Sequence, residues 1–365
     1  MKREQHRIVG LVLVLVLVLR LFEWVPLRCG GDGLPFKAVN LGGWLVIEGW
    51  MTPSLFHNIP NKDLLDGTQV HFKSVKLNKY LCAEHGGGSS LVANRNIPKT
   101  WETFRLWRIN ETTFNFRVVN KDFIGLSSSD QGEGNYKVLA GAAEPGTTET
   151  FRIVSNVDNP RRVRIQASNG LFLQAENENS VTADYSGSSD EWENEDPSVF
   201  EMHIIKMVQG EYQLTNGYGL EEASKILRNH WSTYIVEDDF EFMSRHGLNA
   251  VRIPVGWWIA YGLVPPKPFV GGSLQSLDDA FEWALNHNMK VILDLHAVPG
   301  SQNGNHHSGT RDGFIEWDDS KIPETVSVVD FLAKRYAEHP SLGAIEFDLV
   351  RRSSSSSSQL RPYSG

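Results

Sequence analysis

Residues 290–305 read KVILDLHAVPGSQNGN, a strand pattern that runs into a glycine-rich polar turn. After Lys290 the run is apolar except for Asp294, as is typical of a strand in a parallel sheet covered on both faces. Asp294 and His296 are two residues apart, so their side chains point to the same face of that strand. The segment predicts a parallel α/β sheet that carries chemically useful side chains where its strands end.

Strands and helices alternate on either side of this segment. The predicted strands are 37–47, 249–255, 290–295 and 342–347, and the predicted helices are 220–231, 236–246, 276–288 and 323–338. The third helix is expected to begin at Ser276, with Asp279 completing a capping box. Such alternation favours a (β/α)8 barrel. Only four strands are present, and about 170 residues are left for this part, whereas a full barrel needs about 250.

A segment with a different sequence pattern separates the first predicted strand from the others. Three segments align as strand, tight polar turn and second short strand: 71–85, 116–130 and 163–177. Phenylalanines recur after them at intervals of 47 and 49 residues: Phe104, Phe151 and Phe200. Units this small cannot bury their apolar faces alone, so three of them predict a closed β-trefoil. The acidic stretch 190–196 is expected to be a solvated loop.

The predicted fold class is therefore α/β plus all-β: a partial (β/α)8 TIM barrel of about four strands, interrupted by a β-trefoil insertion. The expected domains are 1–29, a signal peptide; 34–66, the first barrel strand; 67–207, the trefoil; 208–347, the partial barrel; and 348–365, a low-complexity tail.

The N-terminus has the pattern of a secretory signal. Lys2, Arg3 and Arg7 precede an apolar run over residues 8–19, which is too short to span a bilayer comfortably. A signal anchor is the alternative. We therefore expect a secreted protein of the extracellular space or cell wall, with no membrane contact after signal cleavage.

The composition restricts the classes of binding partner that we expect. The 365 residues are 41% hydrophobic and 22% charged, as in globular proteins, and the net charge of -9 disfavours a nucleic-acid partner. The two cysteines, Cys29 and Cys82, show neither a metal nor a nucleophile signature. Nothing in the composition indicates an oligomeric state.

Three motifs occur in order: AVNLGGWLVIEGWMTPSLFH at 38–57, NAVRIPVGWWI at 249–259, and the stretch at 291–305. Together they closely resemble the exo-β-1,3-glucanase branch of glycoside hydrolase family 5. The repeat block resembles the fascin-like trefoil inserted in some plant members. The resemblance implies retaining hydrolysis of a β-glucan or gluco-oligosaccharide, without a metal or organic cofactor.

The resemblance also implies a substrate-binding set of Glu48, Arg252 and His296. Arg252 follows an apolar strand start, where a guanidinium can keep a carboxylate ionised; the family's matching arginine holds the nucleophile. A structural ion pair is its alternative. The family's matching histidine and glutamate hydrogen-bond the sugar.

Other readings of His296 stay open. It could be a satisfied core histidine. It could also belong to an Asp-x-His metal site with Asp294, helped by His306 and His307, although the sequence shows no convincing further ligands. No metal site is therefore expected.

Some residues depart from the family pattern. Gly49-Trp50 follows Glu48, and 305–307 reads Asn-His-His where an aromatic and an acid are usual. The family continues its fourth strand into Asn-Glu-Pro, whose glutamate is the acid/base, and its nucleophile lies after the seventh strand. Here Phe347-Asp348 follow Glu346. We therefore expect a truncated member without catalytic residues and without activity. A non-catalytic carbohydrate-binding protein that uses the trefoil is the alternative.

Overall fold

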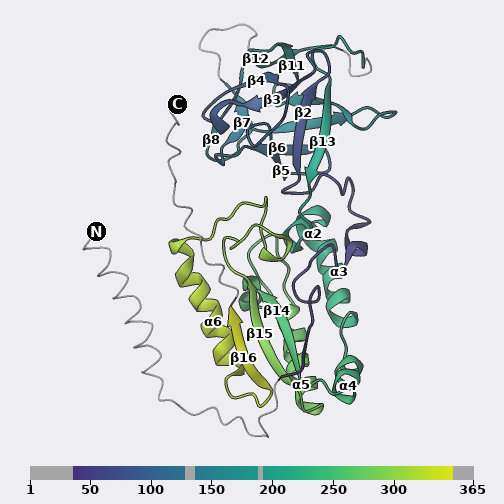
Figure 1. Ribbon diagram of the computed structural model, residues 1–365, viewed down its shortest axis with the longest axis vertical. Helices are drawn as coiled ribbons and strands as arrows, with labels where there is room; N and C mark the ends of the chain where they lie inside the picture. The colour runs from purple at the N-terminus through teal and green to yellow at the C-terminus, as the bar shows by residue number, and fades with distance from the viewer. Residues whose placement is uncertain (1–35, 128–135, 188–191, 348–365) are drawn as a thin grey trace, which may run out of the picture. The chain divides into compact units, whose positions relative to one another are not determined.

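The computed structural model describes residues 36–127, 136–187 and 192–347 (Figure 1). The predicted signal peptide and the predicted tail lie outside these residues. The described residues from Ala38 onward belong to one compact unit, which contains a parallel sheet with helices and an antiparallel β block. Among the described residues, no helix is long and apolar enough to cross a membrane.

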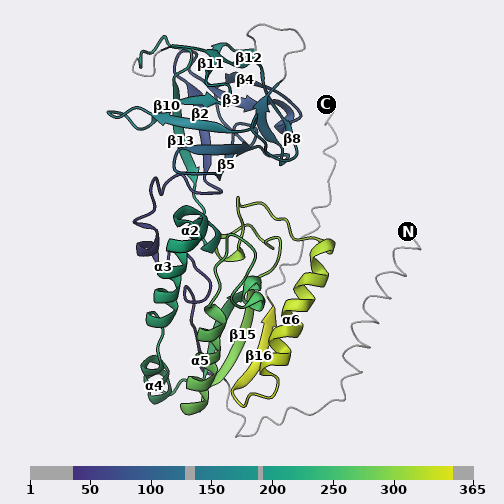
Figure 2. The ribbon, with the colours of Figure 1, turned by 180° about the vertical axis from the view of Figure 1, so that it is seen from behind.

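The parallel sheet has four strands in the order β1 (Ala38–Asn40), β14 (Ala250–Gly256), β15 (Lys290–Ala297) and β16 (Leu342–Phe347). Every neighbouring pair is parallel. Helix α5 (Ser273–Asn286) connects β14 to β15, and α6 (Ile322–Tyr336) connects β15 to β16. Figure 2 shows α6 beside β16 at the end of the described chain. The predicted strand–helix alternation is confirmed.

In the described part of the chain, three further helices precede β14: α2 (Glu211–Tyr218), α3 (Leu220–Thr233) and α4 (Glu237–Arg245). Each of the helices α3 to α6 has an apolar stripe at helical spacing, and these stripes join one hydrophobic core with β14 and β15. The shared core contains one or more large side chains from every one of them, including Leu227, Phe240, Phe281, Leu332, Ile253 and Leu293. Short 3₁₀ turns complete the chain: η1 (Pro53–Phe56), η2 (Glu84–Gly86), η3 (Trp257–Tyr261), η4 (His306–Ser308) and η5 (Asp319–Lys321).

Two element boundaries were predicted wrongly. The first strand ends at Asn40, because the chain turns at Gly43 with a φ of 71° and continues as buried turns instead of the predicted strand to Ile47. Helix α5 begins at Ser273 after Gly272, so Ser276 is not its cap. Helix α2 was not predicted, because its sequence EYQLTNGY lacks an apolar stripe and its polar residues are buried by distant parts of the chain.

The β block contains twelve strands: β2 (Gln69–Ser74), β3 (Lys79–Ala83), β4 (Ser89–Arg95), β5 (Phe104–Arg108), β6 (Thr113–Arg117), β7 (Phe123–Leu126), β8 (Val138–Ala142), β9 (Phe151–Ser155), β10 (Arg162–Ala167), β11 (Phe172–Asn177), β12 (Ser180–Tyr185) and β13 (Phe200–Lys206). Strands β2, β5, β6, β9, β10 and β13 pair in a closed antiparallel ring. The others form hairpins. A four-strand unit thus occurs three times, and the recurring phenylalanines Phe104, Phe151 and Phe200 are buried at the starts of β5, β9 and β13.

Two buried arginines in this block form ion pairs with carboxylates from different parts of the chain. Arg164 in β10 is fully buried and pairs with Asp196 of its own repeat. Asp196 was predicted to lie in a solvated loop, and this was wrong: the ion pair with Arg164 holds it at 9% exposure. Arg117 in β6 instead donates to Asp312, at 2.7 Å, in the connection between β15 and α6.

Asp312 is 2% exposed, and its carboxylate accepts hydrogen bonds from two residues of the β block. Its Oδ2 accepts from Arg117 and, at 2.7 Å, from the indole of Trp107. Arg117 also donates to Glu316 at 3.0 Å. Loss of the aspartate carboxylate would remove the acceptor of the Trp107 indole and leave the buried Arg117 guanidinium to Glu316, whose side chain is 46% exposed.

We predict that Asp312→Ala lowers the free energy of unfolding by about 3–5 kcal/mol, the usual cost of breaking a buried pair from one side. Urea denaturation monitored by Trp fluorescence measures the change. Asp330→Ala is the matched control, because the Asp330 carboxylate is exposed and pairs with Lys334 on the same helix. Equal effects of the two substitutions would show that the buried pair is not special.

A second prediction concerns Glu211, which is 1% exposed at the start of α2. Burial raises the pKa of its carboxyl from 4.5 to about 8, and the Trp258 indole and the Ile47 backbone offset this only in part. Between about pH 4.5 and pH 8 the unfolded chain ionises this group while the native protein keeps its proton, so native stability falls as pH rises. Glu211→Gln removes the penalty. The variant should gain stability relative to wild type across that window, by a few kcal/mol at its top, in unfolding titrations at several pH values. A difference that does not change with pH would contradict the assignment.

Candidate functional site

A single buried carboxylate joins the ends of neighbouring strands. Asp294 in β15 is fully buried, and its Oδ2 lies 2.8 Å from Nη2 of Arg252 in β14 and 2.8 Å from Nδ1 of His296. Arg252 also donates to Glu346 in β16 at 2.8 Å and to Asn40 in β1 at 3.1 Å. Since parallel strands end at one edge of a sheet, side chains from all four strands meet there.

Two glycines bring Glu48 to this edge. The Gly49 N–H donates to the carbonyl of Gln209 at 2.7 Å, and Glu48 forms a β-bridge with Gly210. A Cβ on Gly49 would lie 2.5 Å from that of Gln209, and one on Gly210 would lie 2.0 Å from the carbonyl oxygen of His306. Only glycine allows three chain segments to cross so closely, and the crossing fixes Glu48 against the turn η4.

The turn η4 supplies His307. Its Nδ1 lies 3.7 Å from the Glu48 carboxylate, and its ring centre is 4.4 Å from that of His296. The Asn303 amide nitrogen lies 2.9 Å from Nε2 of His307. The hydrogen bond with His307 lowers the pKa of Glu48, and partial burial opposes this. The carboxylate is therefore an ionised acceptor at neutral pH.

The site has an aromatic edge. Trp50 donates its indole N–H to Glu48 at 3.0 Å, while 70% of the residue is exposed. Its ring therefore has a fixed position but an open surface. The sequence marked Trp50 as a departure from the family pattern, without a function.

All three predicted binding residues lie in this arrangement. Arg252 and His296 share Asp294, and His296 adjoins Glu48 through His307. Their binding of a ligand stays a prediction. His306 does not join them: its Nδ1 accepts from the Gln209 N–H at 2.8 Å, and burial lowers its pKa.

Sequence reasoning missed Asn40 and Asn303. Asn40 could have been found, because it ends a strand and is polar, and polar side chains late in a strand also drew attention to Asp294 and His296. Asn303 carried no signal, since its partner His307 is recognisable only after the loop is folded.

The side chains of this site can form hydrogen bonds with a polar ligand. The site combines an ionised acceptor, a guanidinium, two imidazoles and an exposed indole. Glu48, His296 and His307 could also hold a metal, because their ligand atoms lie within 4.8 Å of one another.

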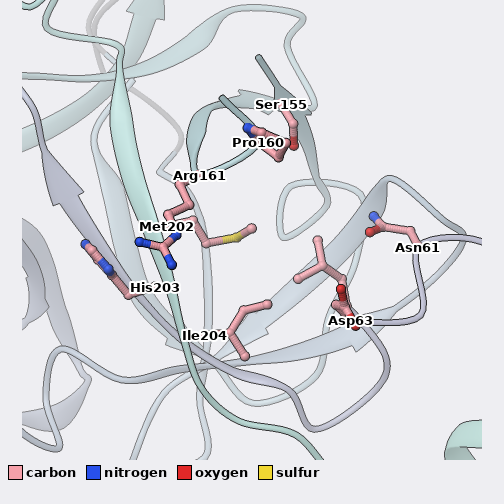
Figure 3. Close-up of a pocket in the computed structure, with 9 residues that line it drawn as sticks. Asn61, Asp63, Ser155, Pro160, Arg161, Met202, His203 and Ile204 are labelled. Atoms are coloured by element: carbon pink, nitrogen blue, oxygen red, sulfur yellow. The ribbon is translucent and has the colours of Figure 1, made fainter. Parts of the chain in front are cut away.

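A separate hollow of about 370 Å³ lies on the β block (Figure 3). Arg161, Met202 and His203 line one side of it, and Asn61 and Asp63 line the other. None of the predicted binding residues belongs to it.

Known proteins match the two parts of the chain separately. Residues 61–205 match a domain of unknown function (DUF7910). Residues 215–346 match the cellulase family, glycosyl hydrolase family 5.

Curated relatives match over a similar length. A probable glucan 1,3-beta-glucosidase A of Emericella nidulans is 46% identical over 141 residues, which are 38% of this chain and 34% of the relative. A glucan 1,3-beta-glucosidase of Pichia angusta is 44% identical over 142 residues, 38% of this chain and 32% of the relative. The chain thus spans about a third of the length of these relatives.

Among solved structures, a rutinosidase from Aspergillus niger aligns with a TM-score of 0.34 and 21% identity, covering 37% of this chain and 39% of that chain. The family model and the curated relatives agree with each other: both show that residues 215–346 of this chain are similar to glycosyl hydrolase family 5.

Proposed function

We propose that this chain is the saccharide-recognising part of a glycoside hydrolase of the exo-β-1,3-glucanase type, acting on β-glucan or gluco-oligosaccharides. The observation that carries the proposal is the Asp294 carboxylate, which pairs with Arg252 and His296, while a ligand atom of His296 lies within 4.8 Å of one of Glu48. The names of the curated relatives support the substrate class.

The proposed architecture is a partial (β/α)8 barrel, formed by residues 34–66 and 208–347, with a β-trefoil inserted over 67–207. The parallel order β1, β14, β15, β16 follows the chain, as in such barrels. A six-strand ring with three hairpins fits a trefoil. The N-terminal apolar run supports secretion to the extracellular space or cell wall.

Each side chain has a proposed part in recognition. Glu48 accepts from a sugar hydroxyl, and His296 offers Nε2, because its Nδ1 faces Asp294. Trp50 offers its exposed ring face to the apolar face of a sugar. Arg252 orders the edge through its carboxylate partners.

We propose that this chain does not hydrolyse glucan. Retaining hydrolysis needs two carboxyl groups about 5 to 5.5 Å apart across the scissile bond, one acting as acid/base and the other as nucleophile. Asp294 is fully buried against Arg252 and His296, so it offers no second carboxyl group opposite Glu346, which Arg252 also binds. Glu48 is occupied by Trp50 and His307.

Binding can be measured by isothermal titration with laminari-oligosaccharides, beside cello-oligosaccharides of equal length. We expect Glu48→Gln and His296→Ala each to weaken laminari-oligosaccharide binding by about tenfold, the equivalent of about 1.4 kcal/mol. His57→Ala, an exposed histidine outside the site, is the control and should leave affinity unchanged. Undiminished binding in both site variants would refute the proposed site.

Glucose release from laminarin tests the absence of hydrolysis. We expect none above the level of a buffer blank. Turnover that is present in the wild type and lost in Arg252→Ala would overturn this part of the proposal.

The hollow in Figure 3 supports a second candidate, a carbohydrate-binding protein that uses the β block. Its lining combines Arg161, His203 and Asn61, which can hydrogen-bond hydroxyl groups. The same titration separates the two candidates. Binding lost in Arg161→Ala and kept in His296→Ala would assign recognition to the β block, and the reverse pattern would assign it to the parallel sheet.

A further inference from the structure

The groups around Glu48 resemble a metal site in composition. The ligand atoms of Glu48, His296 and His307 come from three separate parts of the chain and lie within 4.8 Å of one another. Two imidazoles and one carboxylate form the protein ligand set of several zinc sites that keep a fourth position open. Magnesium and calcium prefer oxygen ligands, so this set favours a zinc-type ion.

His296 is already oriented as a ligand would be. The buried Asp294 carboxylate lies 2.8 Å from its Nδ1, and a ring proton on that nitrogen, beside the carboxylate, would leave the Nε2 lone pair available. A carboxylate behind a ligating histidine is the usual outer partner in zinc sites, where it fixes the ring and raises its basicity. Here Asp294 is itself held by Arg252, so this partner has a fixed position.

Glu48 and His307 require only a small approach. Two ligands of one tetrahedral zinc ion, each about 2.0–2.1 Å from it, are about 3.3–3.4 Å apart. The Glu48 carboxylate and Nδ1 of His307 are 3.7 Å apart. A shift of a few tenths of an ångström is within the reach of partly exposed side chains.

His307 needs one local change. Coordination through Nδ1 requires the ring proton to sit on Nε2, and a hydrogen-bond acceptor must face it. In the structure the Asn303 amide nitrogen faces Nε2 at 2.9 Å, so the amide must turn over to present its oxygen. An aspartate at position 303 would present an acceptor in either orientation.

From this geometry we propose that Glu48, His296 and His307 bind one divalent transition-metal ion of the zinc type. The ligands are a carboxylate oxygen of Glu48, Nε2 of His296 and Nδ1 of His307. His306 takes no part, because its Nδ1 accepts from Gln209. Since Glu48 and His296 are also the proposed sugar contacts, ion and saccharide exclude each other; this consequence alone rests on the proposed function.

The test is isothermal titration of zinc chloride into the whole chain, first stripped with EDTA and exchanged into chelator-free buffer, without saccharide. We expect one ion per chain. His307→Asn and Glu48→Gln should each weaken binding by at least about tenfold, since even loss of an outer hydrogen-bond partner costs about 10–100-fold. His306→Gln and His57→Gln, two histidines outside the set, should leave affinity unchanged.

Asn303→Asp should change the zinc affinity in the opposite direction. Its carboxylate accepts the Nε2 proton of His307, so zinc should bind more tightly than to wild type, an outcome that a misfolded variant cannot produce. No stoichiometric zinc binding by wild type would overturn the proposal. So would unchanged affinity in His307→Asn, loss of binding in His306→Gln, or weaker binding in Asn303→Asp.

A second titration separates this proposal from the proposed function. Laminari-oligosaccharide is titrated once with EDTA and once with saturating zinc. Zinc binding without saccharide binding in EDTA would refute only the saccharide site. Saccharide binding in EDTA that zinc weakens supports the shared site, and saccharide binding that zinc leaves unchanged overturns it.

Discussion

The buried carboxylate of Asp294 is the constraint on which the site depends. A charge without water must be paired, and here both partners are groups of the site, Arg252 and His296. Asp294 lies 2.8 Å from Nδ1 of His296, and Arg252 extends to β1 and β16, where it donates to Asn40 and Glu346. One carboxylate in the middle of the sheet thus orders side chains from all four strands.

The remaining half of the site depends on close packing of the backbone. Gly49 and Gly210 allow the segment after β1, the start of α2 and the turn η4 to cross with almost no space between them. Glu48 and His307 face each other because of that crossing. The connection from β15 to α6 then continues from His307 to Asp312, so one loop carries a site residue and the ion pair with the β block.

Much of this organisation could be predicted from local patterns. Strand–helix alternation gave the parallel sheet, and the spacing of Phe104, Phe151 and Phe200 gave the repeated four-strand unit. Position near a strand end identified His296, and position after an apolar strand start identified Arg252. These features depend on neighbouring residues, and for that reason a sequence displays them.

What could not be predicted depends on distant partners. Helix α2 has no apolar stripe, and its burial comes from the rest of the fold. His306 and His307 are neighbours with the same side chain, yet only the crossing at Gly210 determines which of them faces Glu48. The burial of Asp196 follows from Arg164, 32 residues away. No local rule relates such pairs.

The different partners of Arg117 and Arg164 affect whether the β block could be transferred to another protein. The third repeat neutralises its buried arginine from within, whereas the second borrows Asp312 from the hydrolase-family segment. Moved to another scaffold, the block would carry an uncompensated cation at Arg117. Positions 117 and 312 are therefore expected to change together among homologues. The β block is not expected to be transferable to another protein without loss of stability.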